Sequence, residues 1–459
     1  MADRDALHSP SRTEPATPHL PAQRGVSRGR MTLLFTVMLV TAAGNTAMQS
    51  VMPSIGTELG VADVWISLAY TWSALLWVVC APYWARRSDR RGRKAMMALG
   101  LVGFILSFAL CGTLLWLGLN GVLGAMATLL LFAAARSLYG GFGSAAPPAV
   151  QAYVASRTPR AERTQAMALI ASSFGLGTVI GPALAPLLVF PLTGLPGPFF
   201  AFTLLAIVVL VALRVSLPND DPMFPARSEV VGAPYGANTN PGVSEDEDEG
   251  EAAGEPDIPN LSWRDPRLRP WLFAGLVGGH AQAAFLGIVG FFILDRLGLR
   301  ATPNEGTGPI GLVLMCGAIA TLLAQWGLIP RFKLGPRSST LWGMALSIVG
   351  VLAFAASSNL HAIALGMAIA SLGFGLFRPG YTAGSSLAVS RAEQGQIGGI
   401  IASVNGAAYV VAAPIGVWLY GHHAWIGFLT ICALCGVVFV VGWRSLESDA
   451  VLEGRREER

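Results

Sequence analysis

Long stretches without a charged side chain dominate the chain, and their lengths predict its secondary structure. Met31–Thr57 and Val64–Ala85 contain 27 and 22 uncharged residues. About 20 apolar residues in a helix cross the hydrocarbon core of a bilayer. Each of the two stretches therefore predicts one membrane-spanning helix.

Longer stretches in the first half of the chain predict further helices joined by turns. Ala95–Ala135 has 41 uncharged residues, and 20 more follow Arg136; Thr164–Leu213 has 50. Gly118-Leu-Asn-Gly121 interrupts the first of these stretches, and the Pro- and Gly-rich segment 191–198 interrupts the last. The first half of the chain is therefore expected to contain six helices.

The second half repeats this plan. Its uncharged stretches, of 25, 25, 40 and 50 residues, are Pro270–Leu294, Gly306–Pro330, Ser338–Phe377 and Gln394–Trp443. Turn-forming segments at 357–361 and 421–424 divide the two longest. The sequence thus predicts an all-α integral membrane protein with twelve transmembrane helices.

Motif spacing indicates that the two halves are related. Gly141-Phe-Gly143 begins 41 residues before Pro182, and Gly373-Phe-Gly375 begins 41 residues before Pro414. We interpret this as two parallel six-helix repeats. Internal repeats of this kind are typical of transporters, whose halves rock about a shared central site.

Polar segments divide the chain into five parts. We expect a disordered tail over 1–29, a six-helix half over 30–216, a flexible acidic linker over 217–268, a second six-helix half over 269–445 and a tail over 446–459. The acidic run in the linker, Glu245–Glu251, is expected to be solvated. Isolated acidic runs rarely form defined metal sites, so we expect no metal site in this chain. We also expect no cofactor.

The basic residues predict the orientation in the membrane. Lys and Arg crowd the loops between helices 2 and 3, 4 and 5, and 8 and 9, whereas loops 1–2, 3–4 and 5–6 contain none. The positive-inside rule then places both termini and the linker in the cytoplasm. The compact, Arg- and Ala-rich chain with short loops suggests a bacterial inner membrane.

Composition excludes several classes of protein. Only 13% of the residues are charged, about half of the usual share in soluble domains, and 53% are hydrophobic. The net charge is only +4, and the Lys and Arg residues are concentrated in a few short segments that do not form a nucleic-acid surface. The five cysteines lie in apolar stretches and are expected to pack as small hydrophobic residues.

Three motifs resemble those of a known family. Asp89-Arg-Arg-Gly-Arg-Lys94 resembles the signature of the major facilitator superfamily, although Ala85 occupies the position of its first glycine. Arg136-Ser-Leu-Tyr-Gly140 is similar to the family's Arg-x-x-x-Gly element. Gly177–Pro182 resembles the antiporter motif of drug:proton exporters, with Ala185-Pro186 in place of its Gly-Gly. The resemblance implies the major facilitator fold and secondary active transport.

Two of these motifs predict moving parts. The gate is expected just before helix 3, where the Asp89 carboxylate has basic neighbours able to pair with it. The predicted gate residues are Asp89, Arg90, Gly92, Arg93 and Lys94. The hinge is expected on helix 5 at Gly177, Gly181 and Pro182, because the glycines share one face and the proline removes a backbone hydrogen bond.

Polar side chains inside the spans are the candidates for a central cavity, because such groups are costly in lipid. Arg136 and Arg378 are charged, and no span has an acidic residue at its centre. They predict a cationic cavity that prefers anionic substrates, unless they bind internal carbonyl groups. The uncharged candidates are Asn45, Gln49, Tyr70, His280, Gln282, Asn405 and Tyr409. His280 is the candidate proton carrier, because its side chain type titrates near neutral pH.

The sequence carries no nucleophile elbow, no HExxH motif and no Gly-rich phosphate loop with a lysine. An enzyme and an ATP-driven pump are therefore not expected. The main interpretation is a monomeric, proton-coupled exporter of drug-like, siderophore-like or similar small organic metabolites. An uptake symporter or uniporter for an organic anion is the alternative, and a non-transporting membrane sensor is a third possibility.

Overall fold

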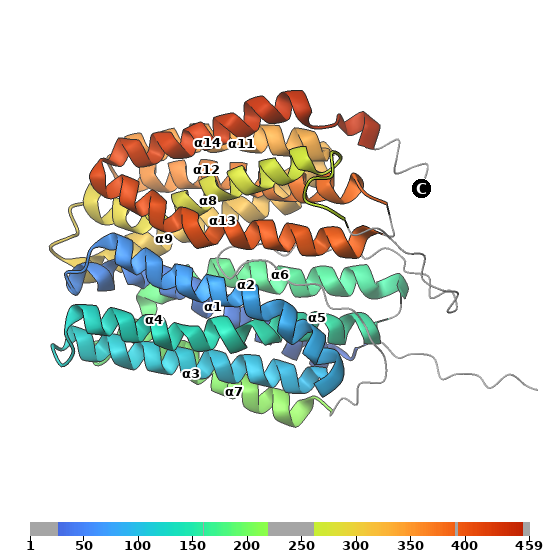
Figure 1. Ribbon diagram of the computed structural model, residues 1–459. Helices are drawn as coiled ribbons and strands as arrows, with labels where there is room; N and C mark the ends of the chain where they lie inside the picture. The colour runs from blue at the N-terminus through green and yellow to red at the C-terminus, as the bar shows by residue number, and fades with distance from the viewer. Residues whose placement is uncertain (1–25, 159, 219–260, 391–392, 453–459) are drawn as a thin grey trace, which may run out of the picture.

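The computed structural model describes residues 26–158, 160–218, 261–390 and 393–452, and these residues form a bundle of helices (Figure 1). The helices of the first half are α1 Arg28–Glu58, α2 Asp63–Arg91, α3 Arg93–Leu119, α4 Ala125–Phe142, η1 Gly143–Ala145, α5 Ala146–Arg157, α6 Arg160–Leu184, η2 Ala185–Leu188 and α7 Gly197–Ser216. The helices of the second half are α8 Arg269–Arg296, α9 Pro303–Leu322, η3 Leu323–Leu328, α10 Ile329–Phe332, α11 Pro336–Ala356, α12 Leu360–Leu387, α13 Gln394–His422 and α14 Ala424–Ser445.

Twelve of the described helical segments are long and apolar enough to cross a membrane, which confirms the expected number. Two spans are composite. The fourth joins α4 and α5 through the short 3₁₀ turn η1, which directly precedes Pro147 and Pro148. The eighth widens into the π-helical stretch η3 just before Pro330. A proline cannot donate the regular backbone hydrogen bond, so each irregularity lies where the sequence interrupts the helical ladder.

Helix packing follows the internal repeat. In the first half α1 packs on α6, α3 on α4 and α3 on α7; in the second half the equivalent pairs are α8 on α13, α11 on α12 and α11 on α14. The halves meet mainly through α2 with α13 and through α6 with α9. Because α9 is the repeat equivalent of α2 and α13 is that of α6, the two contacts are equivalent to each other. Figure 1 shows the halves as two neighbouring bundles, α1–α7 below and α8–α14 above.

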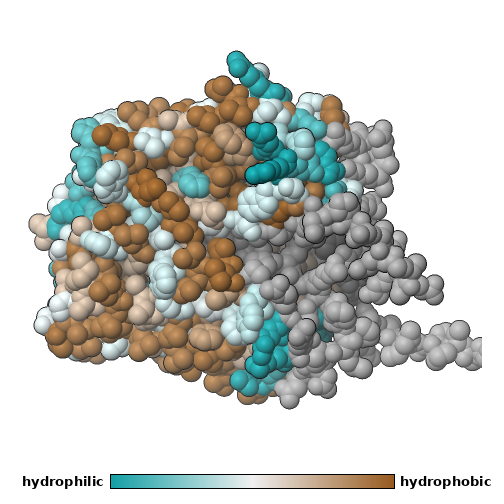
Figure 2. All heavy atoms as spheres, in the orientation of Figure 1, coloured by the Kyte–Doolittle hydropathy of each residue, from teal (hydrophilic) through white to brown (hydrophobic). Residues whose placement is uncertain are grey.

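The surface matches a membrane environment. Large apolar side chains cover the flank of the molecule, whereas hydrophilic residues gather at its two ends (Figure 2). Leu130, Leu204 and Leu365 are each more than 60% exposed, which is favourable against lipid tails. The end at which α1 begins and α14 finishes is called the terminal side below. The end carrying the α1–α2 and α8–α9 loops is called the distal side.

The link between α2 and α3 differs from the expectation. Asp89 was placed in a loop before helix 3, but α2 continues through it to Arg91, and only Gly92 separates α2 from α3. Part of the expected C-terminal tail is docked: Asp449 accepts hydrogen bonds from the backbone N–H groups of Arg337 and Ser338 at 2.7 and 3.0 Å. A carboxylate there satisfies free N–H groups in the first turn of α11. Most of the expected N-terminal tail and most of the expected linker lie outside the described residues.

Candidate functional site

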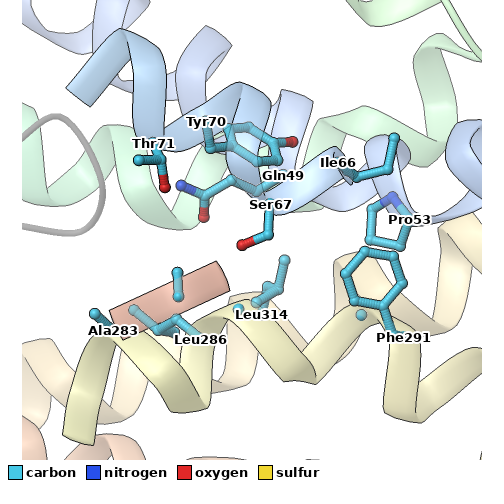
Figure 3. Close-up of a pocket in the computed structure, with 13 residues that line it drawn as sticks. Gln49, Pro53, Ile66, Ser67, Tyr70, Thr71, Ala283, Leu286, Phe291 and Leu314 are labelled. Atoms are coloured by element: carbon cyan, nitrogen blue, oxygen red, sulfur yellow. The ribbon is translucent and has the colours of Figure 1, made fainter. Parts of the chain in front are cut away.

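A cavity lies between the two halves, toward the distal side (Figure 3). It encloses about 720 Å³ not occupied by protein atoms, part of which is open to solvent. Its lining residues are Gln49, Pro53, Ile66, Ser67, Tyr70, Thr71, Ala283, Leu286, Gly287, Gly290, Phe291, Leu314 and Ala413.

The wall formed by α1 and α2 carries the polar groups of the cavity. Gln49 and Ser67 direct their amide and hydroxyl groups into the open space (Figure 3). The Thr71 hydroxyl is buried and has no protein hydrogen-bond partner. The Tyr70 hydroxyl instead approaches the carbonyl of Met48 at 3.4 Å. A buried hydroxyl without a partner is costly, so a ligand that supplies one would bind favourably here.

The opposite wall is apolar. It is formed by α8, α9 and α13 through residues such as Leu286, Phe291 and Leu314. Gly287 and Gly290 of α8 border the cavity and pack closely on Ala413 and Pro53. None of the residues that line this described cavity carries a charge.

Arg136 is not among the residues that line the described cavity. Its side chain is fully buried in the first half, where Nη2 donates to Asn45 Oδ1 at 3.0 Å. The guanidinium also lies 4.7 Å from the ring centroid of Tyr139 and 5.8 Å from that of Phe108. Asn45 is 1% exposed, so it too faces the helix core rather than the cavity. The reason is that α4 packs between α2 and α3, which turns Arg136 toward neighbouring helices.

Arg378 is also not among the residues that line the described cavity, and its role in substrate binding stays a prediction. It is 5% exposed on α12, a helix that packs on α8, α9 and α11. Asn405 accepts a hydrogen bond from the hydroxyl of Tyr381 and is likewise absent from the lining. Tyr409 lies on α13, and its side chain is outside the described ones.

His280 and Gln282 lie on α8, and neither is a lining residue. His280 precedes Ala283 by three residues and Gly287 by seven, so it shares their helix face one turn nearer the terminal side. Its Nδ1 lies 2.6 Å from the carbonyl of Leu276, a contact in which Nδ1 carries the proton and donates.

The expected gate residues whose side chains are described form hydrogen bonds to other residues of the first half. Gly92 has a φ of 87°, a conformation that favours glycine, and it forms the corner between α2 and α3. Arg93 donates to the Ser156 hydroxyl on α5, and Lys94 donates to the carbonyl of Arg214 on α7 at 2.9 Å. The side chains of Asp89 and Arg90 lie outside the described ones.

The expected hinge glycines lie at a close helix contact. A Cβ atom on Gly177 would lie 2.7 Å from Ala42 Cβ, and one on Gly181 would collide with Thr46 and the backbone of α1. The Thr46 hydroxyl donates to the Gly177 carbonyl at 3.2 Å across this contact. The carbonyl of Pro182 faces the other half, where it packs on Gly311 of α9.

Of the predicted cavity residues, only Gln49 and Tyr70 are among the lining residues, and Ser67 and Thr71 were missed. Their signal in the sequence is a helical spacing: Ser67, Tyr70 and Thr71 occupy one face of α2 at intervals of three and four. Ser73, three residues beyond Tyr70, is fully buried and donates to the Arg136 carbonyl.

Comparisons with known proteins agree with this architecture. Multidrug resistance protein 1 of Bacillus subtilis is 23% identical over 90% of this chain and 96% of its own length. A probable actinorhodin transporter of Streptomyces coelicolor is 29% identical over 41% of this chain and 30% of its own length.

Solved structures show the same fold. A bacterial homolog of the human lysosomal transporter Spinster, in an inward-facing and unoccupied conformation, has a TM-score of 0.66 at 12% identity. The match covers 93% of this chain and 95% of that one. The human organic anion transporter MFSD10 has a TM-score of 0.58 at 18% identity, covering 92% of this chain and 100% of that one.

A family model covers the greater part of the chain. The model of the Major Facilitator Superfamily matches residues 34–333, from α1 to the end of the eighth span. The twelve apolar helices make the chain a multi-pass membrane protein, and the family and the relatives are transporters rather than enzymes. This chain therefore belongs to the Major Facilitator Superfamily and is a transporter of small molecules.

Proposed function

We propose that this transporter is a proton-coupled exporter of uncharged, amphipathic organic molecules. The observation that carries the proposal is the cavity between the halves, with hydroxyl and amide groups on one wall and apolar side chains on the other. A molecule with an apolar body and a few hydrogen-bonding groups complements both walls. The alternative substrate class, organic anions, has less support because no cationic side chain lines the described cavity.

Export is supported by the relatives, several of which are named multidrug resistance proteins. Gly177–Pro182, which resembles the antiporter motif, forms the close contact between α6 and α1. We therefore assign the direction of transport as outward from the cytoplasm.

Proton coupling is the energy source we propose. The sequence has no phosphate-binding loop that would indicate ATP hydrolysis. We assign the role of proton carrier to His280, which shares the α8 helix face of the lining residues Ala283 and Gly287 and belongs to a residue type that titrates near neutral pH. Proton uptake there would place a positive charge close to the bound molecule and favour its release.

The orientation and assembly belong to the same proposal. The basic loops place the terminal side, with both chain ends, in the cytoplasm of a bacterial cell. The distal side then faces outward across the inner membrane. The chain works as a monomer, because its cavity is complete within one polypeptide.

Transport in proteoliposomes with an imposed pH gradient tests the proposal. A lipophilic fluorescent ester and its matching acid are compared as substrates, and we expect gradient-driven accumulation of the ester only. Thr71→Val removes the unpartnered hydroxyl and should raise the KM for the ester about three- to tenfold, the effect of one hydrogen bond.

Thr113→Val is the matched control, because Thr113 is exposed on α3 and bonds only its own helix at Ala109. Its KM should equal that of the unmodified chain. Transport of the acid in preference to the ester would overturn the substrate class. Accumulation that is independent of the pH gradient would overturn proton coupling.

A further inference from the structure

An ion-pair cluster joins the two halves on the distal side. Arg300, in the α8–α9 loop of the second half, donates from Nη1 and Nη2 to the two carboxylate oxygens of Asp63 at 2.8 and 2.7 Å. Asp63 is the first residue of α2 and belongs to the first half. Nη1 also donates to the Thr57 hydroxyl of α1 at 3.1 Å. A single guanidinium therefore holds two helices of the opposite half.

Arg300 is also held firmly to its own half. Its Nε donates to Asp295 Oδ1 at 2.7 Å, and Nη2 donates to Oδ2 at 3.2 Å. The Tyr420 hydroxyl of α13 donates to the same carboxylate at 2.6 Å. Arg300 thus presents a fixed planar fork to Asp63, the geometry in which an arginine–carboxylate pair is strongest.

The cluster is partly sheltered from solvent. The side chains of Arg300 and Asp63 are 32% and 21% exposed. Burial opposes the charged form of Arg300, but its hydrogen bonds to the carboxylates of Asp63 and Asp295 outweigh this effect and hold the pKa of the guanidinium above its usual range. The pair is consequently stronger than a fully exposed surface ion pair.

The same cluster covers the distal end of the cavity. The guanidinium of Arg300 lies 5.7 Å from the ring centroid of Phe291, and Phe291 lines the cavity. Beside it, Gly290 of α8 packs so tightly on Pro53 of α1 that a Cβ atom would collide with the proline ring. Both halves therefore close over the cavity at the level of the ion pair.

We propose that the Asp63–Arg300 pair is a distal latch, an ionic contact that closes the cavity on this side and breaks when the transporter opens there. Its two partners belong to different halves, so the halves cannot separate at the distal end while the fork is intact. The latch stabilises only the distal-closed state. Removing it should shift the conformational equilibrium toward the distal-open state.

Accessibility of the cavity tests the latch without any substrate, so the result is independent of the proposed function. Ser67→Cys supplies a reporter on the cavity wall, in a chain whose five native cysteines are replaced by alanine. A membrane-impermeant maleimide is applied to right-side-out and to inverted vesicles. Arg300→Gln should raise the rate of labelling from the distal side about tenfold and lower it from the terminal side.

Arg296→Gln is the matched control. Arg296 ends α8 on the same side and carries the same charge, but it donates to the Ala355 carbonyl and lies over Phe292, both in its own half. Labelling in this variant should equal that of the reporter chain. An Arg300→Gln variant that labels like the reporter chain, or like Arg296→Gln, would overturn the latch.

The charge swap Asp63→Arg with Arg300→Asp separates an ionic contact from a general loss of structure. It again places one arginine between two aspartates, because Asp295 is retained. The swapped chain should return to slow distal labelling, whereas Asp63→Arg alone should label rapidly. Rapid labelling in the swapped chain would show that a complementary pair does not close this side and would also overturn the proposal.

Discussion

Arg136 and Arg378 show what a charged residue in a membrane span can do besides binding a substrate. Arg136 is fully buried, hydrogen-bonded to Asn45 and flanked by the rings of Phe108 and Tyr139. Arg378 is 5% exposed. A charge in lipid must be satisfied, and internal partners do so as well as a ligand. The alternative that these arginines bind internal groups is thus supported for Arg136 by its bond to Asn45.

A first prediction concerns Arg378. Because its side chain does not line the cavity, Arg378→Gln should weaken binding of an acid and of its ester to the same extent, within about twofold. Titrations of the purified protein with the two ligands measure this. Arg331→Gln, at an exposed arginine of α10, is the control and should bind both ligands normally. If the acid loses tenfold more affinity than the ester, Arg378 contacts the substrate.

At the scale of the element, glycines determine how closely helices approach. Gly177 and Gly181 place α6 directly against α1, and Gly373 and Gly350 do the same for α12 and α11. In a membrane, such contacts depend on van der Waals packing, since lipid supplies no hydrophobic drive between helices. The glycines of the antiporter-like motif therefore have a packing role that follows from the structure, and the hinge stays a prediction.

The second prediction concerns Gly181. Gly181→Ala should lower the thermal stability of the detergent-solubilised protein, with a cost of about 1–3 kcal/mol, because the new methyl group collides with α1. Gly436→Ala on α14, where a Cβ atom meets no neighbour within 4 Å, is the control. Equal melting temperatures in the two variants would show that α6 can move away from α1 without cost.

At the scale of the whole molecule, contacts between the halves differ in role from contacts within them. The α2–α13 and α6–α9 pairs and the distal latch join the two bundles. Such inter-half contacts exist in one conformation of a rocking transporter and are absent in the other. A substitution at this interface is expected to change the populations of the two states more than the stability of either half.

The third prediction tests that distinction with Gly290. Gly290→Ala adds a methyl group against Pro53 of the other half and should raise distal labelling of the Ser67→Cys reporter about threefold or more, with little change in melting temperature. Gly308→Ala on α9, where a Cβ atom meets no neighbour within 4 Å, provides the reference. A large fall in melting temperature without faster labelling would instead indicate that the two halves behave as one rigid core.

The amino-acid sequence by itself determined the twelve helices, their two related halves and the family. These features depend on the length of apolar stretches and on local motifs, which the bilayer constrains directly. Only the tertiary structure decided which polar side chains face the cavity. Arg136 and Gln49 are both polar residues within spans, yet one points into packed helices and the other into open space. The distal latch was equally hidden, since Asp63 and Arg300 are 237 residues apart and only the packing of the halves brings them together.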